Sequence, residues 1–222
     1  MIGNHRMATV IAATLLAVCS PAASAVTLVD KPVDDTYFGW SSTINDVNQQ
    51  MADELTLASS AVANQLTWYG LNYMPTSPTN TFRIHLYADA GGVPAITPFY
   101  NQLLGIVDGT PTGLTNDANI EILQYHSPIP AVPLNAGTYW LSIATTEFGW
   151  IWSHATAAAV GDNEYYRTAD FHEWLSVLVT NPGSVRLDQA FTLSGVVPEP
   201  ASLFLAGPAI AAAALAHHRR RA

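Results

Sequence analysis

Residues 81–94 read TFRIHLYADAGGVP and indicate the fold class of the chain. Over the first seven positions apolar and polar side chains alternate. Phe82, Ile84 and Leu86 fall on one face, and Arg83, His85 and Tyr87 fall on the other. A period of two residues is typical of a β-strand, and the glycine pair with the following proline predicts a turn.

Similar runs recur on both sides of this segment. Residues 119–125 have apolar side chains on both faces, which indicates a strand buried on both sides, and residues 138–144 alternate. Further candidate strands cover 54–57, 63–73, 102–108, 150–154, 174–179 and 189–196. Turn-forming Gly, Pro, Asn and Asp residues separate them, and no stretch keeps a helical period. Roughly nine to eleven short strands predict an all-β, antiparallel, jelly-roll-like β-sandwich over residues 26–196.

The N-terminal segment has the three parts of a signal peptide. His5 and Arg6 precede an apolar run over residues 7–18, and the small residues Ala23 and Ala25 form a cleavage pattern. This predicts a signal helix in residues 1–25 and cleavage by signal peptidase before Val26. The alternative is a lipoprotein signal ending at Cys19. Because Cys19 is the only cysteine, cleavage after Ala25 leaves no disulfide or thiolate metal site.

The charge distribution limits the possible partners. Between Asp30 and Asp188 there are sixteen acidic and four basic residues, which leaves the predicted mature domain with a net charge of −12. Such a surface repels phosphate backbones, so no nucleic-acid partner is expected.

The last segment combines three unusual features. The triplet Pro198-Glu199-Pro200 is followed by an uncharged run over residues 201–216 and by the basic cluster Arg219-Arg220-Arg221. As a helix the run would span roughly 24 Å, somewhat less than the ~30 Å hydrocarbon core of a membrane. The arginines would stay on the cytoplasmic side. The alternative is a buried C-terminal core helix.

This order of motif, apolar helix and basic stub closely resembles the PEP-CTERM sorting signal of Gram-negative bacteria, here over residues 197–222. The resemblance implies processing by the membrane protease exosortase, transient insertion in the inner membrane, and a final location at the cell surface or outside the cell. It also implies a link to exopolysaccharide and biofilm matrix.

The interior also resembles secreted bacterial β-sandwich domains. The similar stretches are FRIHLYADAGGVP (82–94), AGTYWLSI (136–143), FGWIW (148–152) and DQAFTLSG (188–195). This resemblance implies the fold and the location, and it brings no catalytic residues with it.

Two tryptophans are the first candidates for a ligand site. Trp150 and Trp152 lie two positions apart on a predicted strand, so they would share one face about 7 Å apart. Exposed indoles at this spacing could stack on neighbouring sugars of an exopolysaccharide. The alternative is that both indoles fill the core between the sheets.

Acidic turn residues are candidates for a cation site. Asp89 and Asp108 could supply oxygen ligands to Ca²⁺, although neither belongs to a regular calcium loop, and capping of backbone amides is the alternative. His85 and His126 are expected to be half-buried, hydrogen-bonded residues rather than a metal pair. No other cofactor is expected.

The motifs of common enzymes are absent from the sequence, including the nucleophile elbow, the zinc-binding HExxH and the phosphate-binding loop. We therefore expect a non-enzymatic structural or adhesive protein of the extracellular matrix. A carbohydrate-binding module is the alternative. A hydrolase is less expected, because it would need a cleft that gathers scattered acids.

Overall fold

The computed structural model describes residues 25–36, 38–44, 49–73, 79–146, 149–156, 164–177 and 188–198, all as strands and connecting loops apart from one helical position at Val177. The strands are β1 (Val26–Lys31), β2 (Trp40–Ser41), β3 (Gln50–Leu57), β4 (Ala61–Asn72), β5 (Thr79–Ala88), β6 (Tyr100–Asp108), β7 (Thr110–Thr115), β8 (Glu121–Leu134), β9 (Gly137–Thr145), β10 (Trp150–Trp152), β11 (Glu164–Arg167), β12 (Leu175–Ser176) and β13 (Phe191–Val196).

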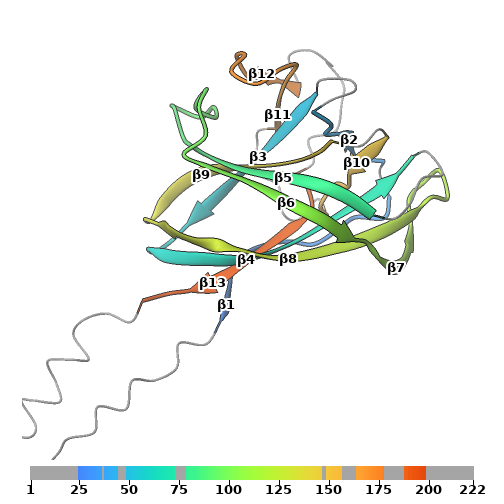
Figure 1. Cartoon of the computed structure of the whole chain (residues 1–222), viewed down its shortest axis with the longest axis horizontal. Helices are drawn as coiled ribbons and strands as arrows, with labels where there is room; N and C mark the ends of the chain where they lie inside the picture. Colours follow the sequence, from blue (N-terminus) through green and yellow to red (C-terminus); the bar gives the residue numbers. More distant parts are fainter. Residues whose placement is uncertain are drawn as a thin grey trace, which may run out of the picture.

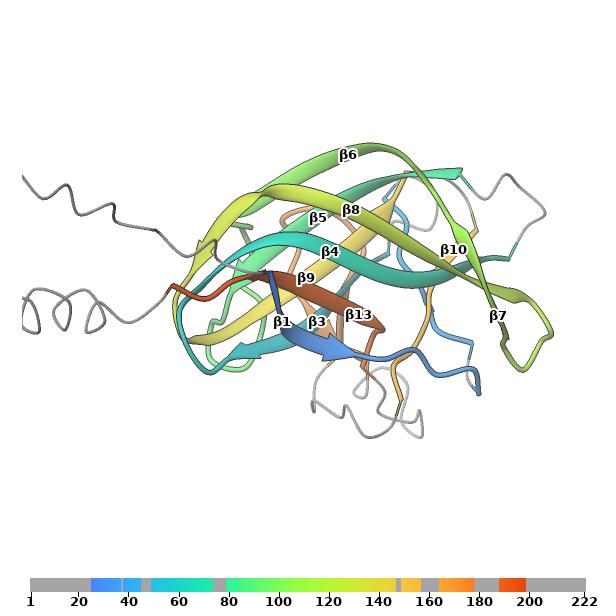
Figure 2. The same cartoon turned by 90° about the horizontal axis from the view of Figure 1, so that it is seen from below.

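The strands form two antiparallel sheets that face each other as a β-sandwich (Figure 1). The seven-stranded sheet has the order β1-β13-β4-β10-β2, with β8 paired to β4 and β7 paired to β8. The six-stranded sheet has the order β12-β11-β3-β9-β5-β6. The chain crosses between the sheets repeatedly, and at one crossing β6 continues directly into β7 (Figure 2). Gly109 is the single residue between these two strands.

Aromatic side chains from both sheets meet in the middle of the sandwich. Phe82 of β5 contacts Trp68 and Tyr125 edge-on, each with ring centroids 4.9 Å apart, and Trp150 at 5.1 Å. Trp68 and Tyr125 stack at 5.7 Å. Edge-to-face and offset contacts are the arrangements that aromatic rings prefer, so this cluster joins the two sheets.

The alternation predicted for residues 81–87 is confirmed in β5. Phe82, Ile84 and Leu86 all lie in the core cluster between the sheets. The opposite face is buried too, since His85 and Tyr87 are almost inaccessible to solvent. Burial on both faces means that something covers the outside of the six-stranded sheet. The cover comes from the β5–β6 loop and the segment after β11, as described below.

Several strand predictions differ from the structure at their ends. The strand predicted to end at Tyr125 continues as β8 to Leu134, through Pro128, Pro130 and Pro133. This extension is possible because β7 pairs only with residues 121–124, so beyond them the outer edge of β8 does not have to donate backbone hydrogen bonds to β7. The sequence did not predict β1, β2, β7 or β11, which are short or irregular in pattern, and the described part of the chain has thirteen strands.

The two ends of the domain lie next to each other. β1 pairs antiparallel with β13, and Val26 lies opposite Gly195 (Figures 1 and 2). The predicted signal helix and the predicted helix over residues 201–216 lie outside the described residues. Within the described residues, no helix is long and apolar enough to cross a membrane.

Candidate functional site

The structure corrects the candidates for glycan stacking. Trp150 and Trp152 do share one face of β10, as predicted, but both side chains are 0% exposed. Trp150 packs on Phe82, and the Trp152 indole N–H donates to the Ala190 carbonyl at 3.0 Å. The face that they share is the core face, so neither indole can reach a sugar in the folded protein. The core-packing alternative is confirmed.

Asp89 caps the turn that follows β5. Its carboxylate accepts hydrogen bonds from the backbone N–H groups of Gly91 (3.2 Å) and Gly92 (3.0 Å) and from the indole N–H of Trp140 (3.0 Å). Both glycines have φ near +85°, a conformation that residues with a Cβ rarely adopt. The amide-capping alternative is therefore confirmed for Asp89.

Asp108, the second calcium candidate, lies exposed at the end of β6 and faces Thr79 in the ladder. Among the described residues, no group of three or more His, Cys, Asp or Glu side chains is arranged to hold a metal ion. His85 and His126 do not pair: His85 is buried on the six-stranded sheet, and exposed His126 on the other sheet contacts the Thr67 hydroxyl at 3.0 Å. The calcium prediction stays open.

The predicted processing sites lie at the ends of the described domain. Ala25 and Pro198 are both exposed, just outside β1 and β13. The remaining residues of these predictions, Ala23, Glu199, Pro200, Arg219, Arg220 and Arg221, are outside the part of the chain that the structure describes.

A groove of about 320 Å³ lies over the outer face of the six-stranded sheet. It forms where the β5–β6 loop meets the segment that follows β11, two loops that rise from the same end of the sandwich (Figure 1). Its lining is mostly apolar and consists of Ala90, residues 93–96, Glu173 and Trp174. Ile96 is 49% exposed, so apolar surface is open to solvent here.

Trp174 is held rigidly in this groove. Its indole N–H donates to the Ala95 carbonyl at 3.1 Å, and its ring meets Tyr87 edge-on at 5.2 Å. The Arg167 guanidinium lies 4.6 Å from the indole centroid, within the range of a cation–π contact. Because these contacts already hold the half-buried indole in place, binding a ligand costs little additional side-chain entropy.

Arg167 is the centre of the polar layer beneath the groove. Its side chain is buried and donates to the Gln50 side-chain carbonyl (2.6 Å), the Tyr87 hydroxyl (2.8 Å) and the Asp170 carboxylate (2.8 Å). A fourth bond, to the Ile96 carbonyl at 3.0 Å, ties this layer to the β5–β6 loop. One buried guanidinium thus joins the sheet to both loops that form the groove.

Gln50 extends this layer across the sheet. Its amide nitrogen lies 2.8 Å from the Nδ1 atom of His85 and 2.9 Å from the Ser142 hydroxyl. Burial lowers the pKa of His85 to about 4, and the charges of Arg167 and Arg83 also oppose protonation, so the imidazole is neutral at physiological pH. Burial also raises the pKa of Tyr87 above its usual range, which keeps its hydroxyl protonated.

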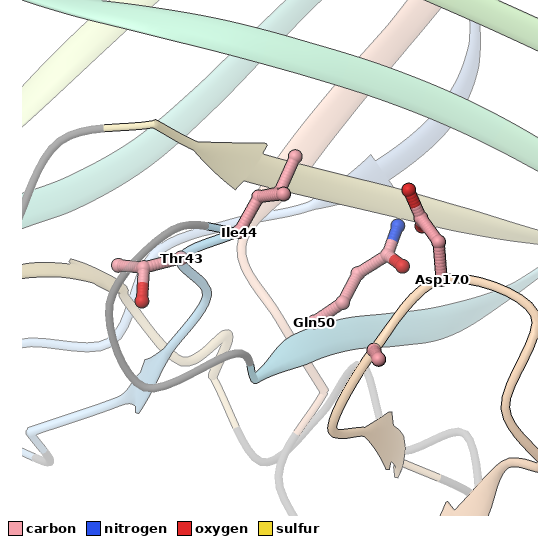
Figure 3. Close-up of a pocket in the computed structure, with 5 residues that line it drawn as sticks. Thr43, Ile44, Gln50 and Asp170 are labelled. Carbon is pink, nitrogen blue, oxygen red and sulfur yellow. The ribbon is translucent and has the colours of Figure 1, made fainter.

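A small cavity adjoins Gln50 at the edge of this layer (Figure 3). Its volume is about 20 Å³, enough for roughly one water molecule, and its lining consists of Thr43, Ile44, Gln50, Ala169 and Asp170. The side chains of Gln50 and Asp170 point toward each other in Figure 3. A space of this size cannot admit a substrate. The groove beside Trp174 is therefore the better candidate for a ligand site.

The sequence did not identify Trp174 as a candidate site residue, because it stands at the start of a predicted strand. The residues before it, Phe171, His172 and Glu173, are exposed. The polar pair His172-Glu173 was the sequence signal that could have indicated a surface position for Trp174. Compared with known proteins, the chain matches no family model and no curated protein.

Proposed function

We propose that this chain is an exported, non-enzymatic β-sandwich protein with a structural or adhesive role in the extracellular matrix of a Gram-negative bacterium. In this proposal the sandwich is jelly-roll-like, signal peptidase cuts after Ala25, and exosortase processes the PEP-CTERM signal over residues 197–222. The supporting observation is the position of the domain ends. The first strand begins at Val26 and the last ends at Val196, so both predicted cuts fall immediately outside paired strands.

This arrangement makes both processing steps compatible with a folded domain. Val26 pairs with Gly195, so Ala25 and Pro198 leave the same end of the sandwich. Removing either terminal segment takes away no strand of the described sheets. A membrane-held precursor could therefore fold completely before its tail is removed.

The location of the acids supports a non-enzymatic role. Asp53, Glu164 and Asp188 come together, but in the buried interior of the sandwich. The groove beside Trp174 has one acid, Glu173, in its lining. Acid–base hydrolysis of a glycoside uses a pair of carboxyl groups on either side of the bond, and the groove lining offers no such pair.

A carbohydrate-binding role is the second candidate, and the groove supports it. Trp174 and Ile96 in the groove lining offer apolar surface to the C–H face of a sugar, while Glu173 and backbone groups can accept hydrogen bonds from its hydroxyls. Because the predicted mature domain is strongly acidic, a neutral or amino sugar suits it better than an anionic polymer.

Intact mass of the protein recovered from its native host tests the export proposal. A chain that begins at Val26 and ends close to residues 198–200 is the expected result. Retention of residues 201–222 on the exported protein would overturn processing by a sorting enzyme, and retention of residues 1–25 would overturn the signal peptide.

Affinity electrophoresis through matrix polysaccharide tests the second candidate. Retardation should disappear in Trp174→Ala and persist in the control Leu103→Ala, which removes an exposed side chain of β6 outside the groove lining. If the parent protein migrates freely through a broad panel of polysaccharides, the carbohydrate-binding role fails and the structural role remains.

A further inference from the structure

A lysine is buried at the end of β1, between the two sheets. The Lys31 Nζ atom lies 2.9 Å from Asp53 Oδ2, 2.7 Å from Asp188 Oδ2 and 2.7 Å from the Glu54 carbonyl oxygen. The ring of Phe191 lies 5.5 Å away. Lysine is seldom buried, and here its amine is fixed in direct contact with a carboxyl group that comes from the opposite sheet.

Asp53, the partner from the opposite sheet, is fully buried on the inner face of β3. Its Oδ2 atom accepts bonds from Lys31 and from the backbone N–H of Gln189 at 3.1 Å. Its Oδ1 atom has no hydrogen-bond partner among the described residues. A buried ionised oxygen in that position is unfavourable, because nothing replaces the hydration that it has lost.

Two more carboxyl groups lie close by. Glu164 faces Asp53 across the β11–β3 ladder and accepts a hydrogen bond from the Gln189 side chain at 2.7 Å, and Asp188 contacts Lys31 directly. His154 lies 3.7 Å from Glu164, but burial lowers its pKa to about 4, so it brings no positive charge at neutral pH.

One ammonium cannot balance three carboxylates in a low-dielectric interior. Burial therefore raises the pKa of Glu164 to about 9 and that of Asp53 to about 7, the latter against the opposing attraction of Lys31. This buried environment thus favours the neutral carboxylic acid form of Asp53 more than solvent would. That form has an electrophilic carbon and a hydroxyl group that can leave as water.

We propose that Lys31 and Asp53 join spontaneously in an intramolecular isopeptide bond between Nζ and Cγ. The Lys31 ammonium passes one proton to the Asp188 carboxylate, and the free amine attacks Cγ of the protonated Asp53 carboxyl. The tetrahedral intermediate then collapses. The Oδ1 hydroxyl leaves as water with the proton returned from Asp188. The nitrogen then passes a second proton to Asp188, so the products are one amide, one water and a protonated Asp188.

Each neighbour has a position suited to this reaction. Asp188 Oδ2 touches the amine and can take and return its protons, and the Gln189 N–H donates to Oδ2, the oxygen on which negative charge develops. The oxygen that leaves is Oδ1, the atom without a hydrogen-bond partner. The bond formed is an ordinary amide, and it removes a buried charge pair that the fold otherwise has to support.

The product would close a covalent loop from Lys31 to Asp53 and join the seven-stranded sheet to the six-stranded sheet. It would also attach β1, the terminal strand of its sheet, to the interior. For a predicted mature chain without cysteine, this bond could supply the cross-link that disulfides give to other exported domains. This inference goes beyond the proposed function, and its test does not depend on export.

Mass spectrometry of the purified full chain tests the bond. The expected mass is lower than that of the sequence by one water, about 18 Da, and the whole deficit should lie in the tryptic peptide that ends at Arg83. Pro32 follows Lys31, so trypsin keeps Lys31 and Asp53 in that one peptide. In tandem mass spectrometry, one backbone cleavage between residues 31 and 53 should release no fragment ion, because the isopeptide bond still joins the two pieces.

The peptide map also separates this bond from another dehydration. A succinimide at Asp108-Gly109 would cause the same mass change, but in the peptide from Ile84 to Arg167. A full-mass peptide ending at Arg83, with an unbroken fragment series between residues 31 and 53, would overturn the proposal and leave Lys31 as an ion pair.

Variants identify the reacting groups. Lys31→Arg keeps the positive charge but should have its full sequence mass, and Asp188→Asn should form the bond at least tenfold more slowly after refolding. Asp53→Asn should reach the same final mass as the parent protein, because it would lose ammonia instead of water. The matched control Glu121→Gln, on exposed surface, should keep the full deficit. A deficit that persists in Lys31→Arg would also overturn the assignment.

Discussion

Glu164 lies directly opposite Asp53 in the ladder between β11 and β3, so two acidic side chains share one buried region of the sandwich. Both are nearly inaccessible to solvent, and the Gln189 side chain donates a hydrogen bond to Glu164 Oε1 at 2.7 Å. Burial, with the negative charges of Asp53 and Asp188, raises the pKa of Glu164 from an ordinary value near 4.5 to about 9. Among the described residues, Lys31 and neutral His154 also contact these acidic groups.

The first prediction concerns the pH dependence of stability. Because the folded-state pKa of Glu164 is above its unfolded value, the folded protein holds the extra proton between about pH 4.5 and 9. The free energy of unfolding should therefore fall as pH rises through this window, by up to about 1.4 kcal/mol per pH unit for this group. Glu164→Gln keeps an acceptor for Gln189 and should flatten the fall.

Urea denaturation across this pH range measures the effect. The control Glu121→Gln, which changes an exposed acid on β8, should leave the pH dependence of the parent protein unchanged. If the free energy of unfolding of Glu164→Gln falls with pH as steeply as that of the parent protein, Glu164 is ionised in the folded protein.

The second prediction concerns Arg167, whose buried guanidinium connects the sheet to the two groove loops. Arg167→Met leaves Gln50 and Tyr87 without their charged partner and should lower the free energy of unfolding by ~3 kcal/mol. Arg167→Lys should recover only part of this loss, since an ammonium cannot reproduce the planar fork.

Chemical denaturation of Arg83→Met is the matched control for Arg167. Arg83 is partly exposed and approaches Asp170 only at 3.9 Å, so its loss should change stability by less than about 1 kcal/mol. Equal losses in the two methionine variants would show that the buried network adds nothing beyond surface charge.

The sequence predicted the fold class because alternation is a local property. The inward residues Phe82, Ile84 and Leu86 are separated by polar positions, and any strand that covers one face of a sheet shows this pattern. β11 was missed because it is short and its charged ends, Glu164 and Arg167, leave no apolar alternation. Both are buried, since their partners, Gln189 and Gln50, come from distant parts of the chain.

The candidate site was less predictable for the same physical reason. Aromatic residues pack in cores and also bind ligands, and the sequence does not say which face of β10 is covered. The groove exists only because the loop containing Ala95 meets a segment 79 residues later in the chain, where Trp174 lies. Local patterns do not encode a contact at that separation, and the polar residues before Trp174 were a surface signal that the strand prediction did not use.

The third prediction tests the structural role of Trp150. Trp150→Ala removes a fully buried indole that packs on Phe82 and should lower the free energy of unfolding by ~3–5 kcal/mol. Ile106→Ala, at a side chain that is 75% exposed, should change it by less than about 0.5 kcal/mol. Thermal denaturation followed by circular dichroism gives both values. A stable Trp150→Ala variant would contradict the packing of the two sheets around this ring.

The fourth prediction concerns Gly70, where β4 passes close to β10. A Cβ atom at this position would lie 2.6 Å from the Ile151 carbonyl oxygen and 2.6 Å from the Trp150 ring, and neither the paired backbone nor the buried indole can move freely. Gly70→Ala should therefore cost ~1–3 kcal/mol of stability, although alanine normally suits a strand better than glycine does.

Gly105→Ala on β6 is the matched control, because no atom lies within 4 Å of its added Cβ. That change should be neutral or slightly stabilising, since it restricts the unfolded chain at no steric cost. If urea denaturation gives the two variants equal stability, the close approach of β4 and β10 at Gly70 is wrong.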